Sequence, residues 1–191
     1  MNHISGLTRY INDIKVVICD IDGVLTDGKI LISEKDWRLK SFDQKDTLGT
    51  MIAKYSNLKQ IWISLHLTEI SKIRGRAIGV DEIIGAKYGK YAAIEEFLLR
   101  DGVEYKNVAY IGDDIDDYMV MERCGFPIAV NDSVQDIKTL AKYITNAKGG
   151  AGAVRESIEL ILKTQGKWEN AVEKFFEAVR NPLVDPTENF R

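Results

Sequence analysis

The sequence predicts an α/β fold in which helices cover both faces of a doubly wound parallel β-sheet. First, short apolar runs of strand length alternate with amphipathic stretches of helical length along most of the chain. Second, the apolar run at 14–19 is continuous rather than alternating, which is typical of a strand buried on both faces. Third, 191 residues suffice for one such domain with a full core but are few for two. We therefore expect a single domain spanning 1–191, with right-handed crossovers between its strands.

In chain order, a polar lead-in at 1–13 precedes the first strand. Two apolar-rich runs, 29–33 and 37–42, flank the polar residues Glu34 to Asp36, and this pattern predicts a β-hairpin. Further strands are expected at 60–64, 82–84, 107–111, 126–130 and 143–144. Helices are expected at 46–55, 68–78, 90–99, 118–123, 134–140, 153–163 and 167–179.

Two of these helices carry an apolar stripe at helical spacing. The stripe of the 68–78 helix comprises Ile70, Ile73, Ala77 and Ile78. The stripe of the 167–179 helix comprises Trp168, Ala171, Val172, Phe175, Phe176 and Val179. The second stripe either packs on its own domain or contacts another subunit. The tail at 181–191 contains two prolines and is expected to be irregular.

Charge and composition favour a small-molecule partner. The chain has 26 Lys and Arg against 29 Asp and Glu, a net charge of −3, with both signs interspersed. Nothing in this pattern attracts nucleic acid or an anionic membrane. The chain contains no apolar run of about 18 residues that could span a membrane, and its only cysteines, Cys19 and Cys124, suggest no disulfide framework. We expect a cytoplasmic protein.

Two carboxylates follow the first strand. Asp20 and Asp22 are separated by one residue, and ligands of parallel sheets bind beyond the carboxyl ends of the strands. Carboxylates this close repel each other unless a cation or a shared proton offsets their charge, and Mg2+ prefers oxygen ligands from one or two carboxylates plus phosphate. The stretch therefore indicates a metal site, and the alternative is an acidic loop that caps a helix.

A second acidic cluster follows the strand at 107–111. Neighbouring strands would bring it to the first cluster, so that Asp113 completes a metal site with Asp20 and the backbone carbonyl of Asp22. Asp114 and Asp117 suit positions that orient these ligands. The alternative, an acidic helix N-terminus favoured by the helix dipole, applies to Asp116 and Asp117.

Between the two clusters lie a hydroxyl and a lysine that suit phosphoryl transfer. Ser64 ends the strand at 60–64, and Lys90 begins the helix at 90–99. Phosphoryl transfer needs hydrogen-bond donors and positive charge around the phosphoryl oxygens, which these two groups supply. Considered separately, Ser64 is more often a helix cap and Lys90 a solvated charge.

The order of these four features resembles the four motifs of haloacid-dehalogenase-type phosphatases. The resemblance implies a Rossmann-like core in which Asp20 attacks phosphorus, Asp22 is the general acid and base, and Ser64 and Lys90 bind the phosphoryl group. The presence of Asp22 argues against the dehalogenase branch. The order of the motifs argues against a response-regulator receiver, in which the acidic pair precedes the phosphoaccepting aspartate.

Within that family, the chain resembles the phosphatases of 3-deoxy-D-manno-octulosonate 8-phosphate and of nonulosonate 9-phosphates. The resemblance covers about 15–166 and rests on 20–28, on 42–49, on 108–114 and on the glycine-rich stretch 149–156. It implies a core at about 14–166, a C-terminal helix and tail at 167–191, and a role in lipopolysaccharide biosynthesis. Because 29–63 and 65–89 are occupied by core elements, no separate cap domain fits. The subgroup covers its site with the hairpin and with neighbouring subunits of a homotetramer, and the tail can approach an adjacent site.

Four positions depart from the pattern of the subgroup and concern the substrate. Leu65 and His66 replace the usual glycine and arginine of the second motif, and Met51 replaces another arginine. In addition, Thr47 stands where a glycine is expected. We therefore expect either a relaxed phosphatase or one in which Lys45, Asp46, His66 and Arg74 bind a modified sugar acid. The alternatives to octulosonate 8-phosphate are a nonulosonate 9-phosphate, another sugar phosphate, or a non-catalytic oligomerisation module.

Overall fold

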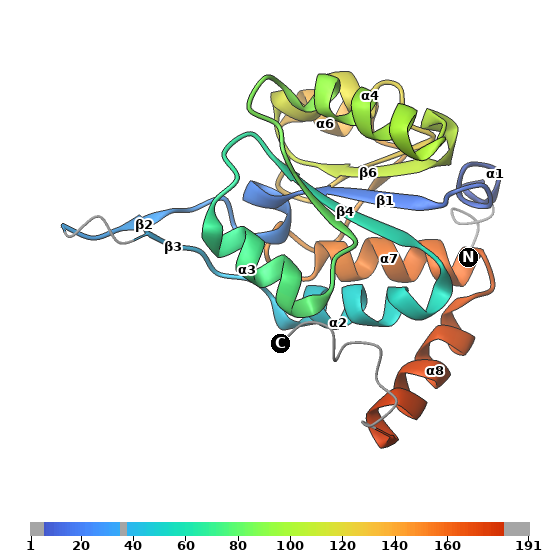
Figure 1. Cartoon of the computed structure of the whole chain (residues 1–191). Helices are drawn as coiled ribbons and strands as arrows, with labels where there is room; N and C mark the ends of the chain where they lie inside the picture. The colour runs from blue at the N-terminus through green and yellow to red at the C-terminus, as the bar shows by residue number, and fades with distance from the viewer. Residues whose placement is uncertain (1–5, 35–37, 182–191) are drawn as a thin grey trace.

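A six-stranded parallel sheet in the order β5-β4-β1-β6-β7-β8 forms the centre of the protein (Figure 1). The computed structural model describes residues 6–34 and 38–181. The strands are β1 (Val16–Asp20), β4 (Lys59–Ser64), β5 (Glu82–Gly85), β6 (Val108–Gly112), β7 (Phe126–Ala129) and β8 (Tyr143–Ile144). The chain builds outward from β1 through β4 to β5, then returns to β6 on the other side of β1. The carboxyl ends of β1 and β6 therefore form the switch point at which doubly wound sheets bind ligands.

Helices cover both faces of the sheet, as predicted (Figure 1). One face carries α2 (Gln44–Ala53), α3 (Glu69–Ile78) and α7 (Ala153–Thr164), and the other carries α4 (Lys90–Asp101), α5 (Tyr118–Met121) and α6 (Gln135–Leu140). A short α1 (Thr8–Ile11) precedes the sheet and α8 (Trp168–Arg180) follows α7. Each face has its own apolar core. Outside the hairpin, every observed boundary lies within two residues of the predicted one.

The alternation of side chains along β1 decides which face receives its terminal carboxylate. Val17 and Cys19 point into the core beneath α2 and α7, whereas Val16 and Ile18 point into the core beneath α4. Asp20 has the parity of Val16 and Ile18, because successive side chains of a strand point to opposite faces. The strand thus delivers this carboxylate to the side on which α4 begins.

The predicted hairpin is present, with shorter strands. Leu31–Ile32 (β2) pairs antiparallel with Arg38–Leu39 (β3), and the part of the predicted return run at 37 lies outside the described residues. The hairpin projects from the body of the protein in Figure 1. Its apolar side chains Leu31, Ile32 and Leu39 are exposed. The hairpin therefore adds an apolar surface that the described part of the chain leaves uncovered.

The predicted apolar face of α3 is wrong in part. Ile73 is 65% exposed and Ala77 is also exposed, whereas Ser71, Gly75 and Ile78 face the core. The helix presents small residues to the sheet because Gly75 lies directly against the side chains of Trp62 and Ile83. The close approach of α3 to the sheet determines which face of the helix is buried, and the hydrophobicity pattern alone did not predict that face.

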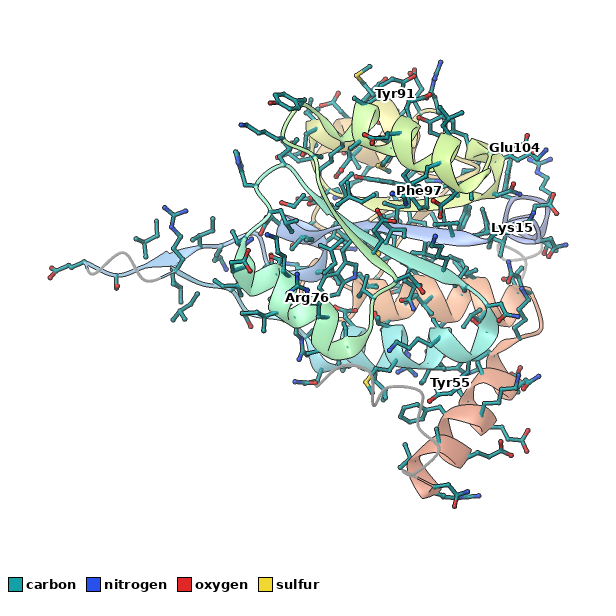
Figure 2. The ribbon with its side chains drawn as sticks, in the orientation of Figure 1. Lys15, Tyr55, Arg76, Tyr91, Phe97 and Glu104 are labelled. Carbon is teal, nitrogen blue, oxygen red and sulfur yellow. The ribbon has the colours of Figure 1, made fainter. Side chains whose placement is uncertain are left out.

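The stripe of α8 packs partly on its own domain. Ala171 is buried, the guanidinium of Arg155 lies 4.9 Å from the Trp168 ring centroid, and Phe175 packs edge-on against Tyr55, which lies close to α8 in Figure 2. Phe176 and Val179 remain exposed. The tail beyond 181 lies outside the described residues. None of the helices in 6–34 and 38–181 is long and apolar enough to cross a membrane.

Candidate active site

Three neighbouring strands deliver the predicted site residues to one edge of the sheet. Asp20 ends β1, Ser64 ends β4, and Asp113 directly follows β6. Lys90 is the first residue of α4, on the face to which β1 directs its terminal carboxylate. The fold thus brings together groups that are up to 93 positions apart in the sequence.

Lys90 lies at the centre of a buried ionic cluster. Its Nζ is 2.7 Å from Asp20 Oδ1, 2.7 Å from Asp116 Oδ2 and 2.7 Å from Asp117 Oδ1, and its side chain is 2% exposed. Burial lowers the pKa of Lys90, but the carboxylates of Asp117 and Asp20 outweigh burial and raise the pKa above its usual value. The lysine is therefore a permanent ammonium that holds three carboxylates in place.

Asp117 is the best-connected of these carboxylates. It accepts hydrogen bonds from the Tyr110 hydroxyl at 2.5 Å and from the backbone amide of Asp113 at 2.9 Å, in addition to the Lys90 ammonium. The Asp114 side chain accepts from the amide of Ile115 at 2.7 Å and so shapes the same turn. Sequence reasoning missed Tyr110, although a polar aromatic residue inside an apolar strand just before Gly112 is a signal that could have identified it.

The donor set fits a hard divalent cation. Oxygen atoms of Asp20, Asp113 and Asp117 lie within 4.8 Å of one another. Burial and then the neighbouring Asp117 raise the pKa of Asp113 to about 7, and the same two causes raise the pKa of Asp20 well above its usual range. The single ammonium of Lys90 contacts three carboxylates, and Asp113 lies beside two of them, so the cluster has more acidic than basic groups and a cation bound by oxygen ligands would offset the difference. Ligation by the backbone carbonyl of Asp22 stays a prediction.

Glycines allow the acidic loops to approach each other closely. A Cβ atom on Gly23 would lie 2.0 Å from Asp113 Oδ2, and a Cβ atom on Gly149 would lie 1.7 Å from the carbonyl oxygen of Gly23. The amide of Gly150 also donates to the carbonyl of Val24 at 2.9 Å. The glycine-rich stretch therefore supports the loop that follows Asp20.

Asp22 is held from two sides. The Ser64 hydroxyl donates to Asp22 Oδ2 at 3.2 Å and in turn accepts from the amide of His66 at 3.1 Å. Lys40 Nζ lies 2.5 Å from Asp22 Oδ1, and the Lys40 side chain is 3% exposed. Sequence reasoning missed Lys40, because a lysine beside a hairpin strand gives no local signal that distinguishes it from a solvated charge.

A cleft of about 490 Å³ adjoins Asp22 between the hairpin and α3. It is lined by Asp22, Ile30, Arg38, Lys40, His66, Thr68, Glu69 and Ile70. Three of these side chains are basic and two are aliphatic. Asp22 and Glu69 are acidic, so the cleft offers both hydrogen-bond donors and acceptors to a polar organic group next to the predicted acid and base.

The four predicted substrate-binding residues are not brought together. His66 lines the cleft, whereas Arg74 donates a hydrogen bond to Thr47 Oγ1 and is not among the cleft residues. Lys45 is exposed on α2, and its side chain lies beside Gly152. The threonine that stands in place of a glycine thus accepts a hydrogen bond from Arg74.

Asp46, predicted as a substrate-binding residue, is engaged by the chain's own backbone, and its contact with substrate stays a prediction. Its carboxylate is 2% exposed and accepts from the amides of Arg155 at 2.8 Å and Gly152 at 3.3 Å, at the start of α7. Burial raises the pKa of Asp46 to about 6. Both oxygens are occupied by the chain's own backbone, so Asp46 joins α2 to α7.

Comparisons with known proteins identify the family of the chain. Residues 51–156 match the model of the haloacid dehalogenase-like hydrolases. The chain is 35% identical over 159 residues to the 3-deoxy-D-manno-octulosonate 8-phosphate phosphatase KdsC of Salmonella typhi, covering 83% of this chain and 85% of that protein.

Solved structures extend the likeness over nearly the whole chain. The 3-deoxy-D-manno-octulosonate 8-phosphate phosphatase of Moraxella catarrhalis, in complex with a magnesium ion, a phosphate ion and KDO, has a TM-score of 0.85 and 32% identity over 92% of this chain and 99% of that chain. A putative hydrolase of the same superfamily from Legionella pneumophila has a TM-score of 0.88 and 30% identity, over 92% and 96% of the two chains.

Proposed function

Because the chain belongs to the haloacid dehalogenase-like hydrolases, we propose that it is a Mg2+-dependent phosphomonoesterase acting on a sugar acid phosphate, with 3-deoxy-D-manno-octulosonate 8-phosphate as the leading substrate. The observation that carries the proposal is the convergence of Asp20, Asp113 and Asp117 around Lys90 at the switch point of the sheet. The curated relative and the Moraxella catarrhalis structure support the choice of substrate and metal.

The chain's own residues account for both halves of the reaction. A carboxylate oxygen of Asp20 forms a bond to phosphorus while the bond from phosphorus to the sugar oxygen breaks, and Asp22 gives its proton to that oxygen. Water then attacks phosphorus, its proton passes to Asp22, and the bond between Asp20 and phosphorus breaks. Ser64 and Lys90 are proposed to bind the phosphoryl oxygens.

Mg2+ is proposed to be held by Asp20, Asp113 and the backbone carbonyl of Asp22. When bound, it neutralises the charge that develops on the phosphoryl oxygens. Asp117 orients the site, since it fixes Lys90 and the amide of Asp113 at the same time. Asp114 fixes the turn that carries Asp113.

The cleft supports an anionic sugar as substrate. Arg38 and His66 line it beside Asp22, where they can donate hydrogen bonds to an anionic group, while Lys40 is paired with Asp22. The positions usually occupied by two arginines hold His66 and Met51, so recognition of the sugar's carboxylate falls to different cations here. A nonulosonate 9-phosphate is the alternative substrate, and a role in lipopolysaccharide biosynthesis in the cytoplasm follows from the leading one.

Assembly into a homotetramer is proposed because residues 6–34 and 38–181 form no separate cap domain over the site and the hairpin exposes apolar side chains. Leu31, Ile32 and Leu39 would be covered if the hairpin packed against a neighbouring subunit. Sedimentation velocity at micromolar concentration should show a tetramer, and a monomer alone would refute this part of the proposal. The non-catalytic alternative is disfavoured because Asp20, Asp22, Lys90 and Asp113 are all present.

A panel of phosphate esters tests the proposed substrate. Values of kcat/KM should be compared for 3-deoxy-D-manno-octulosonate 8-phosphate, a nonulosonate 9-phosphate and neutral hexose phosphates, with Mg2+ and with EDTA. We expect Mg2+-dependent hydrolysis and a preference for the 2-keto-3-deoxy acid phosphates. A strong preference for a neutral hexose phosphate would overturn the substrate and leave the chemistry in place.

A further inference from the structure

We propose that Lys40 is a positioning residue for the reaction: it fixes the carboxyl group of Asp22 in the orientation that proton transfer requires. The inference rests on the proposed function, because it assigns a task to a residue that acts through the proposed general acid and base. It goes beyond that function because it gives a residue at the base of the hairpin a role in orienting the general acid and base. Lys40 directly follows β3, which ends at Leu39.

Burial of Lys40 is the first observation. Its side chain is 3% exposed, whereas Lys29, on the other stem of the same hairpin, has a side chain that is 79% exposed. Lysine is rarely buried without a charged partner, because removing its ammonium from water is costly. The partner of Lys40 is Asp22, at 2.5 Å. A lysine that served only as a solvated surface charge would point outward, as Lys29 does.

The second observation is that Lys40 and Ser64 contact different oxygens of the Asp22 carboxyl group. Lys40 contacts Oδ1, and the Ser64 hydroxyl donates to Oδ2. Two contacts on opposite oxygens fix the rotation of the group about its terminal bond, which a single contact would not do. Proton transfer depends on a distance of about 2.6–3.2 Å between the heavy atoms and on correct orientation. Loss of Lys40 therefore frees a rotation that catalysis requires to be fixed.

The third observation is that the position of Lys40 is itself fixed by the core. Two residues further along the chain, the Phe42 ring stacks on Trp62 with centroids 6.1 Å apart and planes 6° apart. Trp62 lies in β4, the strand that ends in Ser64. The same strand thus supplies one contact to Asp22 directly and anchors the segment that supplies the other.

The test compares Lys40→Met with wild type on three phosphate esters. The first is 3-deoxy-D-manno-octulosonate 8-phosphate, with an alkoxide leaving group and a carboxylate. The second is glucose 6-phosphate, with an alkoxide leaving group and no carboxylate, and the third is 4-nitrophenyl phosphate, whose leaving group needs little protonation. Because kcat/KM reports the steps through cleavage of the ester, we expect a loss of about 10- to 100-fold on both alkyl esters, a fraction of the usual contribution of general acid catalysis. The loss on the aryl ester should be less than about 3-fold on the same reasoning.

Two further variants serve as controls. Lys40→Arg keeps the charge and should recover part of the loss on both alkyl esters. Lys106→Met removes an equal charge from an exposed ion pair with Glu104 and should leave all three values unchanged. Thermal unfolding of each variant establishes that it is folded.

Several outcomes would overturn the proposal. An equal loss on all three esters would indicate a general structural role, and a loss confined to the octulosonate ester would make Lys40 a substrate-binding residue. Unchanged values on every ester would also refute it. Crystal structures of wild type and Lys40→Met provide a readout that needs no activity. If wild type hydrolysed none of the esters, the proposed function would fail. The crystal structures would still test the role of Lys40. An unchanged orientation of the Asp22 carboxyl group in Lys40→Met would refute that role, and a rotated carboxyl group would support it.

Discussion

Replacing Lys90 with methionine should destabilise the protein in a way that Mg2+ partly reverses. The methionine has nearly the shape of the lysine but removes the one ammonium that contacts Asp20, Asp116 and Asp117. Removing one partner of a buried ion pair costs about 3–5 kcal/mol, because the remaining charges stay buried without compensation. Lys106→Met, which removes an exposed ion pair with Glu104, should cost less than about 1 kcal/mol.

Urea unfolding at pH 7 in EDTA, at one protein concentration, measures both losses as changes in the free energy of unfolding. Added Mg2+ should stabilise Lys90→Met more than wild type, because the variant's site is more negative. Each tenfold gain in affinity adds about 1.4 kcal/mol at saturating Mg2+. Lowering the pH should reduce the difference in the free energy of unfolding between wild type and Lys90→Met, since protonation of the unpaired carboxylates relieves their repulsion.

A Lys90→Met protein as stable as wild type in EDTA would refute the conclusion that this lysine offsets the buried carboxylates. A smaller stabilisation by Mg2+ in the variant than in wild type would contradict the inference that cation and ammonium offset the same charge. Only the second result would require a different assignment of the metal site.

Three other changes test separate parts of the site. Asp20→Asn, checked for deamidation, should abolish turnover, and near-normal steady-state activity would exclude the covalent route. Asp113→Ala should weaken Mg2+ affinity and activity together, as measured by titrating activity against Mg2+; a loss of activity at unchanged affinity would contradict its role as a ligand. Burial raises the pKa of Asp46 to about 6 in the folded state, above its usual 3.8, so the folded protein binds this proton more tightly than the unfolded chain. Protonation of Asp46 therefore adds to the free energy of unfolding as the pH falls from about 6 to about 4, by up to about 3 kcal/mol. The difference in unfolding free energy between wild type and Asp46→Ala should follow this change in urea titrations, and a constant difference would refute it.

The elements that local pattern defines were predictable from the sequence. The continuous apolar run at 14–19 indicated a strand buried on both faces, and the position of Asp20 and Asp113 after two such strands indicated that they meet. This inference needs only the geometry of parallel sheets, because the carboxyl ends of their strands lie at one edge. The structure places Asp20 and Asp113 in one cluster.

Features of the site and fold that depend on contacts between distant segments were not predictable from the sequence. Lys40 is defined by a partner 18 residues away, and nothing in the hairpin pattern distinguishes it from Lys29. Asp46 follows a motif that resembles a substrate-binding segment, but α7, more than 100 residues later, occupies its carboxylate. The orientation of α3 was misjudged because Gly75 permits close packing that a hydrophobicity pattern does not record.

The most direct test of the account is to trap phosphate on Asp20 during turnover of 3-deoxy-D-manno-octulosonate 8-phosphate. Rapid acid quench followed by borohydride reduction converts an aspartyl phosphate to homoserine, which peptide mass spectrometry locates in the sequence. The account predicts homoserine at position 20, dependent on Mg2+ and on substrate, and absent from Asp20→Asn. Steady turnover with unmodified Asp20 at every quench time, or homoserine at another position, would contradict it.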